Sequence, residues 1–337
     1  MKRSFVTASV MLALLGVAGS SSALATNSVA ELESVLEDLL EWWPGEWDTL
    51  PQVMLERQYG APPDGEHDRQ YRQFTRVDVP HLGAHVIYGE VRTGGPDGPL
   101  IRGQQVMYLI SVDAERQVVN VNGRRIKGGA EWERVQLDPE KLKRVELDPD
   151  YGGNCDFRFR RYGGILRGHL ANTDEDNLVC TMASRNSGQT MTWDADWAIT
   201  PDEIWIFDNG YLLDPKKPNE PGRLFAGRED LTHERLYRIN RFDCQSIDSA
   251  GVSTRIAGVS DRGGEFSVAR SGGAPASATL LRMPVRRTEG SRLQDTLTLT
   301  VDPTGDSQPS ATTMVDGDAE RVSLDLAVGR VSCAVSR

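Results

Sequence analysis

The sequence predicts a mainly β protein in which an antiparallel barrel follows an N-terminal helix. Short segments of alternating polarity recur between Gly, Pro and Asp turns, and only the N-terminal region carries a long helical pattern. The 337 residues include 33 glycines and 17 prolines, residue types that interrupt long helices. Short and regularly spaced strands are typical of a meander or a closed barrel, and closure removes exposed sheet edges.

The first 25 residues have the pattern of a secretory signal peptide. Met1-Lys2-Arg3 precedes an apolar run over 10–19, and Ala23 and Ala25 have the Ala-x-Ala spacing of a cleavage site. No later stretch reaches the ~18–20 apolar residues that a membrane helix needs. We therefore expect a mature chain that is secreted or periplasmic, without stable membrane insertion.

The charge balance excludes one class of partner. The printed chain has a formal net charge of −11, and the loss of Lys2 and Arg3 with residues 1–25 leaves −13. A field of this sign repels the phosphates of nucleic acids and of anionic lipids. We expect no nucleic-acid partner.

The segment from Val29 to Trp42 is expected to be an amphipathic helix. Ser28 and Glu31 have capping-box spacing, and Pro44-Gly45 marks the end. The apolar residues that recur at helical intervals are Leu32, Val35, Leu36, Leu39 and Leu40. We expect this face to lie on the body, with the neighbouring aromatic cluster of Trp42, Trp43 and Trp47 as a plug on a core.

From Gln52 onward the hydrophobic period changes toward two, which predicts strands. The clearest alternation covers 73–79, 84–91, 105–112 and 117–121. His81 and His85 lie in this region. Residues four apart on a strand are separated by ~13 Å, so these histidines are not expected to share a metal ion.

Four cysteines in an exported chain predict two disulfides, for which three connectivities exist. We favour Cys155–Cys180 together with Cys244–Cys333. The first closes a hairpin-sized loop and contributes on the order of 3 kcal/mol in the loop-entropy model. The second is expected to tie the last strand back to the main body. A zinc site is not expected, because no Cys-x-x-Cys pair is present.

The composition divides the chain into three segments: a signal peptide at 1–25, a barrel domain at 26–244 and a small β-rich module at 245–337. The last segment contains no Trp or Tyr and one Phe. Its strand signatures cover 279–282, 296–301 and 322–336.

Phe157 and Phe159 alternate with Arg158 and Arg160, which predicts a strand with one aromatic and one cationic face. Two interpretations stay open for the arginines. They form an exposed basic face, or they face an anionic ligand through bidentate hydrogen bonds.

The usual signatures of enzymes are absent. There is no Gly-x-Ser-x-Gly elbow, phosphate loop, His-Glu-x-x-His or Gly-x-Gly-x-x-Gly after a strand. Disulfide-bonded cysteines leave no thiol nucleophile. The sequence therefore favours a binding fold, or catalysis by holding and orienting a ligand.

A series of segments resembles the CpcT/CpeT family of phycobiliprotein chromophore lyases over about residues 32–244. In order they are Trp43-Pro44-Gly45-Glu46-Trp47, Tyr88-Gly89-Glu90-Val91, Asn154-Cys155-Asp156, Cys180, Asp208-Asn209-Gly210-Tyr211, and Gly227 with Tyr237-Arg238. The resemblance implies a calycin-like antiparallel barrel that holds an open-chain tetrapyrrole, or bilin, in its mouth or lumen. The family delivers the bilin to a cysteine of an acceptor protein.

The resemblance also implies candidate ligand-binding residues, namely Asp208, Glu90, Arg102, Tyr88, Arg158 and Arg160. Asp208 is the first candidate, and Glu90 the second, for a carboxylate that pairs with pyrrole nitrogens. The arginines are candidates for the propionates, and Tyr88 for a stacking surface. The bilin is the only cofactor-like molecule implied, no metal is expected, and no catalytic residue is assigned.

Three positions depart from the family pattern. Where the family has Glu-Gln, this chain has Glu90-Val91. Where the family has Arg-Gln-Arg, this chain has Gly103-Gln104-Gln105, with Arg102 displaced by one position. Asp-Arg-Gly becomes Asp208-Asn209-Gly210, a triplet that also has the composition of a hairpin turn. The alternative to ligand binding by Glu90 is an ion pair between Glu90 and an arginine of a neighbouring strand.

Three hypotheses follow. The chain is a bilin lyase or a close relative, an exported non-catalytic barrel that binds a small apolar or tetrapyrrole-like ligand, or a structural or interaction protein of the envelope. Whether it is an enzyme, which acceptor protein it meets and whether it forms a homodimer are left open.

Overall fold

A computed structural model describes residues 29–62, 65–149, 154–173, 180–183, 188–216, 222–230, 232–268, 275–286, 291–302, 310–327 and 329–336. The expected signal peptide lies outside this part of the chain. Among the described residues, no helix has both the length and the apolar character needed to cross a membrane.

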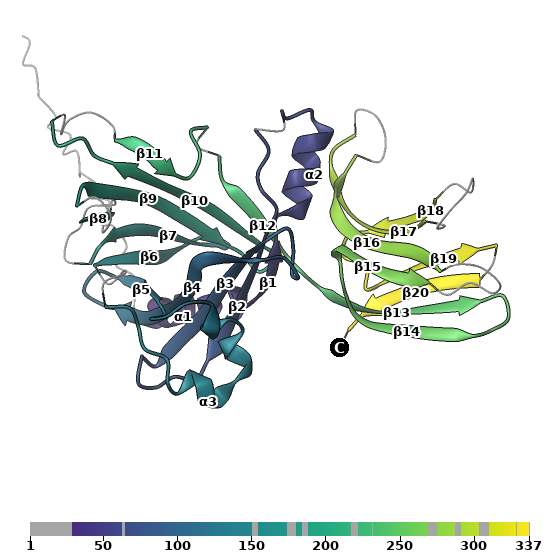
Figure 1. Ribbon diagram of the computed structural model, residues 1–337, viewed down its shortest axis with the longest axis horizontal. Coiled ribbons are helices and arrows are strands. Elements are labelled where there is room, and N and C mark those ends of the chain that lie inside the picture. The colour runs from purple at the N-terminus through teal and green to yellow at the C-terminus, as the bar shows by residue number, and fades with distance from the viewer. Residues whose placement is uncertain are drawn as a thin grey trace, which may run out of the picture.

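Ten antiparallel strands of the described chain close into a barrel, which confirms the predicted fold class (Figure 1). In spatial order they are β10 (Glu203–Leu212), β12 (Glu234–Arg238), β1 (Gly45–Asp48), β2 (Gln70–Val77), β3 (His85–Thr93), β4 (Leu100–Asp113), β5 (Val118–Arg125), β6 (Cys155–Tyr162), β7 (Ile165–Asn172) and β9 (Thr190–Ile199). Strand β9 pairs with β10 and closes the ring. Two short strands, β8 (Cys180–Ala183) and β11 (Arg223–Ala226), extend β9 and β10.

Helix α1 (Val29–Trp42) has the predicted bounds and packs its apolar face against β4, β5 and β6. Trp43, which follows it, is fully buried among aromatic rings of the barrel wall. Its ring centroid lies 4.7 Å from that of Tyr108, 5.2 Å from Phe74 and 5.6 Å from Trp197. The predicted plug is therefore confirmed, and the aromatic cluster fills the middle of the barrel.

A second helix, α2 (Leu50–Gln58), occupies a segment where the sequence predicted the start of a strand pattern. That prediction is wrong for this segment. Pro51 lies in the first turn of α2, where the missing amide hydrogen costs no helical bond, and the Asp48 carboxylate accepts a hydrogen bond from Leu50 N at 2.8 Å. The helix stands between the barrel and the C-terminal strands (Figure 1).

The segment between β5 and β6 covers the outer face of β3 and β4. It contains η1 (Ala130–Trp132), η2 (Val135–Leu137) and α3 (Pro139–Leu142). Asp138 caps α3 by accepting a hydrogen bond from Lys141 N at 3.0 Å. The buried side chains of Val135 and Leu142 pack with Tyr88 and Met107 in a cluster separate from the barrel interior.

The remaining strands form two four-stranded sheets around one shared core, here called the C-terminal sandwich. Its strands are β13 (Arg241–Asp248), β14 (Ser253–Ser260), β15 (Arg262–Val268), β16 (Ala276–Val285), β17 (Gln294–Asp302), β18 (Ala311–Asp316), β19 (Arg321–Leu326) and β20 (Gly329–Val335). The single strand predicted over 322–336 is wrong, because β19 and β20 form an antiparallel pair within it.

Both predicted disulfides are present. Cys155 of β6 is bonded to Cys180 of β8, and Cys244 of β13 is bonded to Cys333 of β20. The expectation that the second bond ties the last strand to the barrel is wrong. Cys244 and Cys333 are directly opposite each other on neighbouring strands of one sheet in the sandwich.

Charged side chains connect the barrel with the sandwich instead. Arg241 of β13 donates from Nε to Glu46 of β1 at 2.8 Å. Arg69 pairs with the fully buried Asp48 at 2.7 Å and donates to the backbone carbonyl of Arg262 at 3.2 Å. These contacts join the sandwich to β1 and the start of β2.

Candidate functional site

The side chain of Asp208 is on the inner face of the barrel. Ile204 and Ile206 of the same strand belong to the barrel core, and alternate residues of a strand share a face. The register between β10 and β9 is continuous from Ile204 to Leu212. The alternative in which Asp208-Asn209-Gly210 forms a hairpin turn is therefore wrong.

Each residue of this triplet has a separate structural role. On the outer face, the Asn209 side chain accepts a hydrogen bond from Arg228 N at 3.0 Å and donates to Arg228 O at 3.1 Å. At Gly210 a Cβ atom would lie 2.8 Å from the ring of Phe225 and 3.1 Å from that of Trp193. Only the absence of a side chain allows these two rings to lie over β10.

Arg72 and Glu234 also face the interior. Arg72 lies opposite the core residue Trp47 and Glu234 lies opposite Ile206, and paired residues point to the same side of a sheet. The two side chains form an ion pair. Arg72 also donates to Gln70 Oε1 at 3.0 Å, while its buried Nε has no hydrogen-bond partner in the described part of the chain.

Asp208 lies close to this pair but is not bonded to it. Its carboxylate forms no hydrogen bond or ion pair with any described residue. Although its side chain is exposed, the surrounding barrel wall limits its hydration, and this desolvation raises the pKa of Asp208 to about 6. The charge of Arg72 opposes the increase in pKa, and that of Glu234 adds to it.

Asp208 lies four residues farther along β10 than the position in register with a contact of α1. Arg161 of β6 pairs with Asp38 of α1, and strand pairing through β7 and β9 places Arg161 in register with Ile204. The Cys155–Cys180 disulfide lies near the other end of β9 and β10, because Cys180 is the register partner of Trp193.

An aromatic pair borders the charged groups. Trp193 and Phe225 have ring centroids 5.4 Å apart and meet edge to face, and the Phe225 side chain is exposed. We call Arg72, Trp193, Asp208, Phe225 and Glu234 the mouth. Sequence reasoning selected only Asp208 from this set. The sequence also indicated an inward-facing Arg72, because Arg72 lies two residues before a core position in a strand of alternating polarity, and such residues share a face.

Tyr88 and Glu90 lie together, but away from the mouth. They are buried on the outer side of β3, under the segment that contains η1 and η2. Glu90 accepts hydrogen bonds from Tyr88 Oη at 2.9 Å and Arg134 N at 3.1 Å, and pairs with Arg92 at 2.9 Å. Its arginine partner comes from its own strand, and the network leaves Glu90 well satisfied.

Arg158 and Arg160 point away from the interior, because Phe159 between them belongs to the barrel core. Arg158 is buried and donates to Asn172 O at 2.7 Å, and Arg160 donates to Arg116 O at 3.1 Å. The backbone of Arg102 is in β4, and its side chain lies outside the described part of the chain.

The fold and this site define a closed antiparallel barrel with a filled centre and a charged mouth bordered by aromatic rings. No protein-family model matches the chain, and neither does any curated protein. The function of the chain is therefore inferred from the geometry of the mouth.

Proposed function

We propose that this chain is an exported barrel that binds a small ligand in its mouth. The observation that carries the proposal is the unpaired carboxylate of Asp208 on the inner face of a barrel with aromatic walls. The barrel wall disfavours the ionised form of this carboxylate, and a ligand that brings a hydrogen-bond donor or a positive charge would favour it. The two disulfides fit an extracellular chain, which supports a secreted or periplasmic location.

The ligand chemistry that fits best is that of an open-chain tetrapyrrole. Pyrrole N–H groups match the acceptor oxygens of Asp208, and a propionate matches the spare Nε donor of Arg72. The rings of Trp193 and Phe225 offer stacking surfaces for a conjugated chain. This assignment agrees with the sequence resemblance, although it uses Arg72 instead of Arg158 and Arg160.

Delivery of the ligand to an acceptor protein is the second step of this proposal. All four cysteines are in disulfides, so the attacking thiol would belong to the acceptor. Its sulfur would bond to one carbon of a ligand double bond while the thiol proton goes to the conjugated system of the ligand, so no leaving group or oxidant is needed. The barrel would contribute by holding the ligand extended and limiting which face is attacked.

The test is a titration of the mature protein with biliverdin, followed by visible absorption. We expect a saturable red shift and sharpening of the long-wavelength band. The variant Asp208→Asn should bind at least about tenfold more weakly, because a charge-assisted hydrogen bond contributes on the order of 1.5–3 kcal/mol. Asp194→Asn is the matched control, since Asp194 is an exposed carboxylate on the outer face of β9.

The outcomes separate the three hypotheses. Binding followed by covalent transfer to a cysteine of an antenna apoprotein supports the lyase. Binding without transfer supports a carrier. The absence of any spectral change with a tetrapyrrole overturns the bilin proposal and favours a structural or interaction protein of the envelope.

A further inference from the structure

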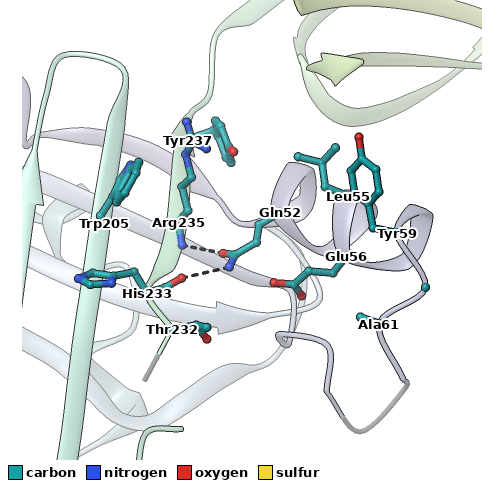
Figure 2. A pocket seen from close by; sticks show the side chains of 11 residues that line it. Gln52, Leu55, Glu56, Tyr59, Ala61, Trp205, Thr232, His233, Arg235 and Tyr237 are labelled. Carbon is teal, nitrogen blue, oxygen red and sulfur yellow. Dashed lines mark hydrogen bonds between the residues drawn. The ribbon is translucent and has the colours of Figure 1, made fainter. Parts of the chain in front are cut away.

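An open groove of about 760 Å³ lies on the outer side of the barrel, between α2 and the strands β10 and β12 (Figure 2). Its walls include Gln52, Tyr59, Trp205, His233, Arg235 and Tyr237. The volume falls in the range of sites for small ligands. The groove is separate from the mouth, because Trp205 and Arg235 alternate with the inward-facing Ile206 and Glu234.

Two exposed aromatic rings form opposite sides of this groove. Tyr59 at the end of α2 is 58 % exposed, and Trp205 of β10 is 43 % exposed. Figure 2 shows Trp205 on the strand side and Tyr59 on the helix side, with the Gln52 and Arg235 side chains between them. Large exposed rings that gather in one concave place are typical of a binding site.

Contacts within the chain hold the groove in shape. The Gln52 side chain donates to His233 O at 3.1 Å and accepts from Arg235 N at 2.6 Å, which fixes α2 to β12 (Figure 2). The guanidinium of Arg235 lies 4.9 Å from the ring centroids of both Trp205 and Tyr237. Binding would therefore require little reorganisation.

The charged groups of the groove already have partners within the chain. Arg235 makes two hydrogen bonds to the Glu203 carboxylate, at 2.6 and 3.0 Å. Glu56 is bonded to the backbone and ring of His67, at 2.8 and 2.6 Å. A charged ligand would have to compete with these pairs, so the groove favours a neutral one.

Three polar groups stay available. The hydroxyls of Tyr59 and Tyr237 and the ring nitrogens of His233 form no hydrogen bond with any described residue. Burial raises the pKa of Tyr237 to about 12, so its phenol stays a donor over the physiological range. Hydroxyl and imidazole groups both donate and accept hydrogen bonds, as a polyhydroxylated ligand requires.

We propose that this groove binds a neutral saccharide, with the apolar face of a pyranose ring against Trp205 or Tyr59 and its hydroxyls bonded to Tyr237 and His233. A sugar combines a flat C–H face with neutral hydroxyls, which matches exposed rings beside uncharged polar groups. A proline-rich peptide also packs on aromatic rings, but it offers mainly acceptors and makes less use of His233. The saccharide site is independent of the ligand in the mouth.

The experiment uses the full mature chain and three tetrasaccharides as probes: cellotetraose, maltotetraose and chitotetraose. Isothermal titration calorimetry should detect saturable binding of at least one probe. The variants Trp205→Ala and Tyr59→Ala should each weaken binding about 5- to 10-fold, as expected for the loss of one stacked ring. They change separate elements, so a folding defect in one leaves the other informative.

Tyr162→Ala is the matched control, because Tyr162 is an aromatic residue of similar exposure in β6, which is separated from β10 by β9 and β7. Both this variant and Asp208→Asn should keep the affinity of the parent chain for the saccharide. The proposal is overturned if no probe binds at millimolar concentration, or if binding is insensitive to both groove variants. Binding of decaproline in the groove, with no saccharide binding, would also overturn it.

Discussion

Arg72 and Glu234, which are 162 residues apart in the chain, form an ion pair on the inner face of the barrel. The pair neutralises itself and leaves Asp208 beside it without a counter-ion among the described residues. Once Asp208 ionises, the three groups carry one excess negative charge. This imbalance is the basis of the proposed mouth and of the first prediction.

The stability of the chain should respond to the titration of Asp208. The pKa of Asp208 is raised from 3.8 to about 6 in the folded state, so the folded chain holds this proton more tightly than the unfolded chain does. The resulting contribution to the free energy of unfolding is complete below the unfolded-state pKa. It is lost as the pH rises to about 6. Urea unfolding from pH 3.5 to 7.5 should show that Asp208→Asn becomes progressively more stable relative to the parent chain over this window. A constant difference between the two chains across the range would contradict the placement of Asp208.

Trp43→Ala should destabilise the barrel by about 3–5 kcal/mol, because it removes a fully buried ring that contacts Phe74 and Tyr108. Chemical denaturation measures the change in the free energy of unfolding. Trp205→Ala provides the comparison, since it removes a partly exposed Trp of the outer face and should cost much less. Equal losses in the two variants would argue against the filled barrel.

Glu90→Gln should lower stability by about 3 kcal/mol and leave ligand affinity unchanged. The substitution removes the charge opposite the buried Arg92. Glu90 faces the outer segment instead of the mouth, so biliverdin affinity, measured on the folded fraction, should match that of the parent chain. A selective loss of affinity would move the ligand site toward Tyr88 and Glu90.

The double variant Cys244→Ser with Cys333→Ser should destabilise the sandwich by about 4–5 kcal/mol in the loop-entropy model, because the bond spans 89 residues. All seven Trp residues precede residue 206, so fluorescence follows the barrel alone. Circular dichroism should report an earlier transition for the sandwich while the fluorescence midpoint changes little. A common shift of both signals would indicate that the barrel and sandwich unfold together.

The matched variant at the other bond, Cys155→Ser with Cys180→Ser, should cost less, about 3 kcal/mol, because that bond spans 25 residues. Its effect should appear in the Trp fluorescence, since Cys180 lies opposite Trp193. It should also weaken biliverdin binding, because the bond lies at the mouth.

Local patterns in the sequence were sufficient for much of the architecture. The period of 3.6 located α1 with its observed bounds, and the period of two located β2 to β5. Alternation also assigned Phe157 and Phe159 to one face of β6 and the arginines to the other. These predictions hold because a residue's face within one helix or strand depends only on its spacing from its neighbours.

Tertiary structure decided which of those faces meet. Asp208-Asn209-Gly210 has the composition of a turn, yet pairing with β9 keeps it in a strand and directs Asp208 inward. Closure of the barrel brings Arg72 to Glu234, and the register of β13 with β20 keeps the second disulfide within the sandwich. Contacts between distant segments depend on strand order and register, which single-strand periodicity does not contain. The sequence alone therefore determined the elements and their polar and apolar faces. The mouth exists only because the barrel closes, and the groove exists only because α2 packs against the barrel.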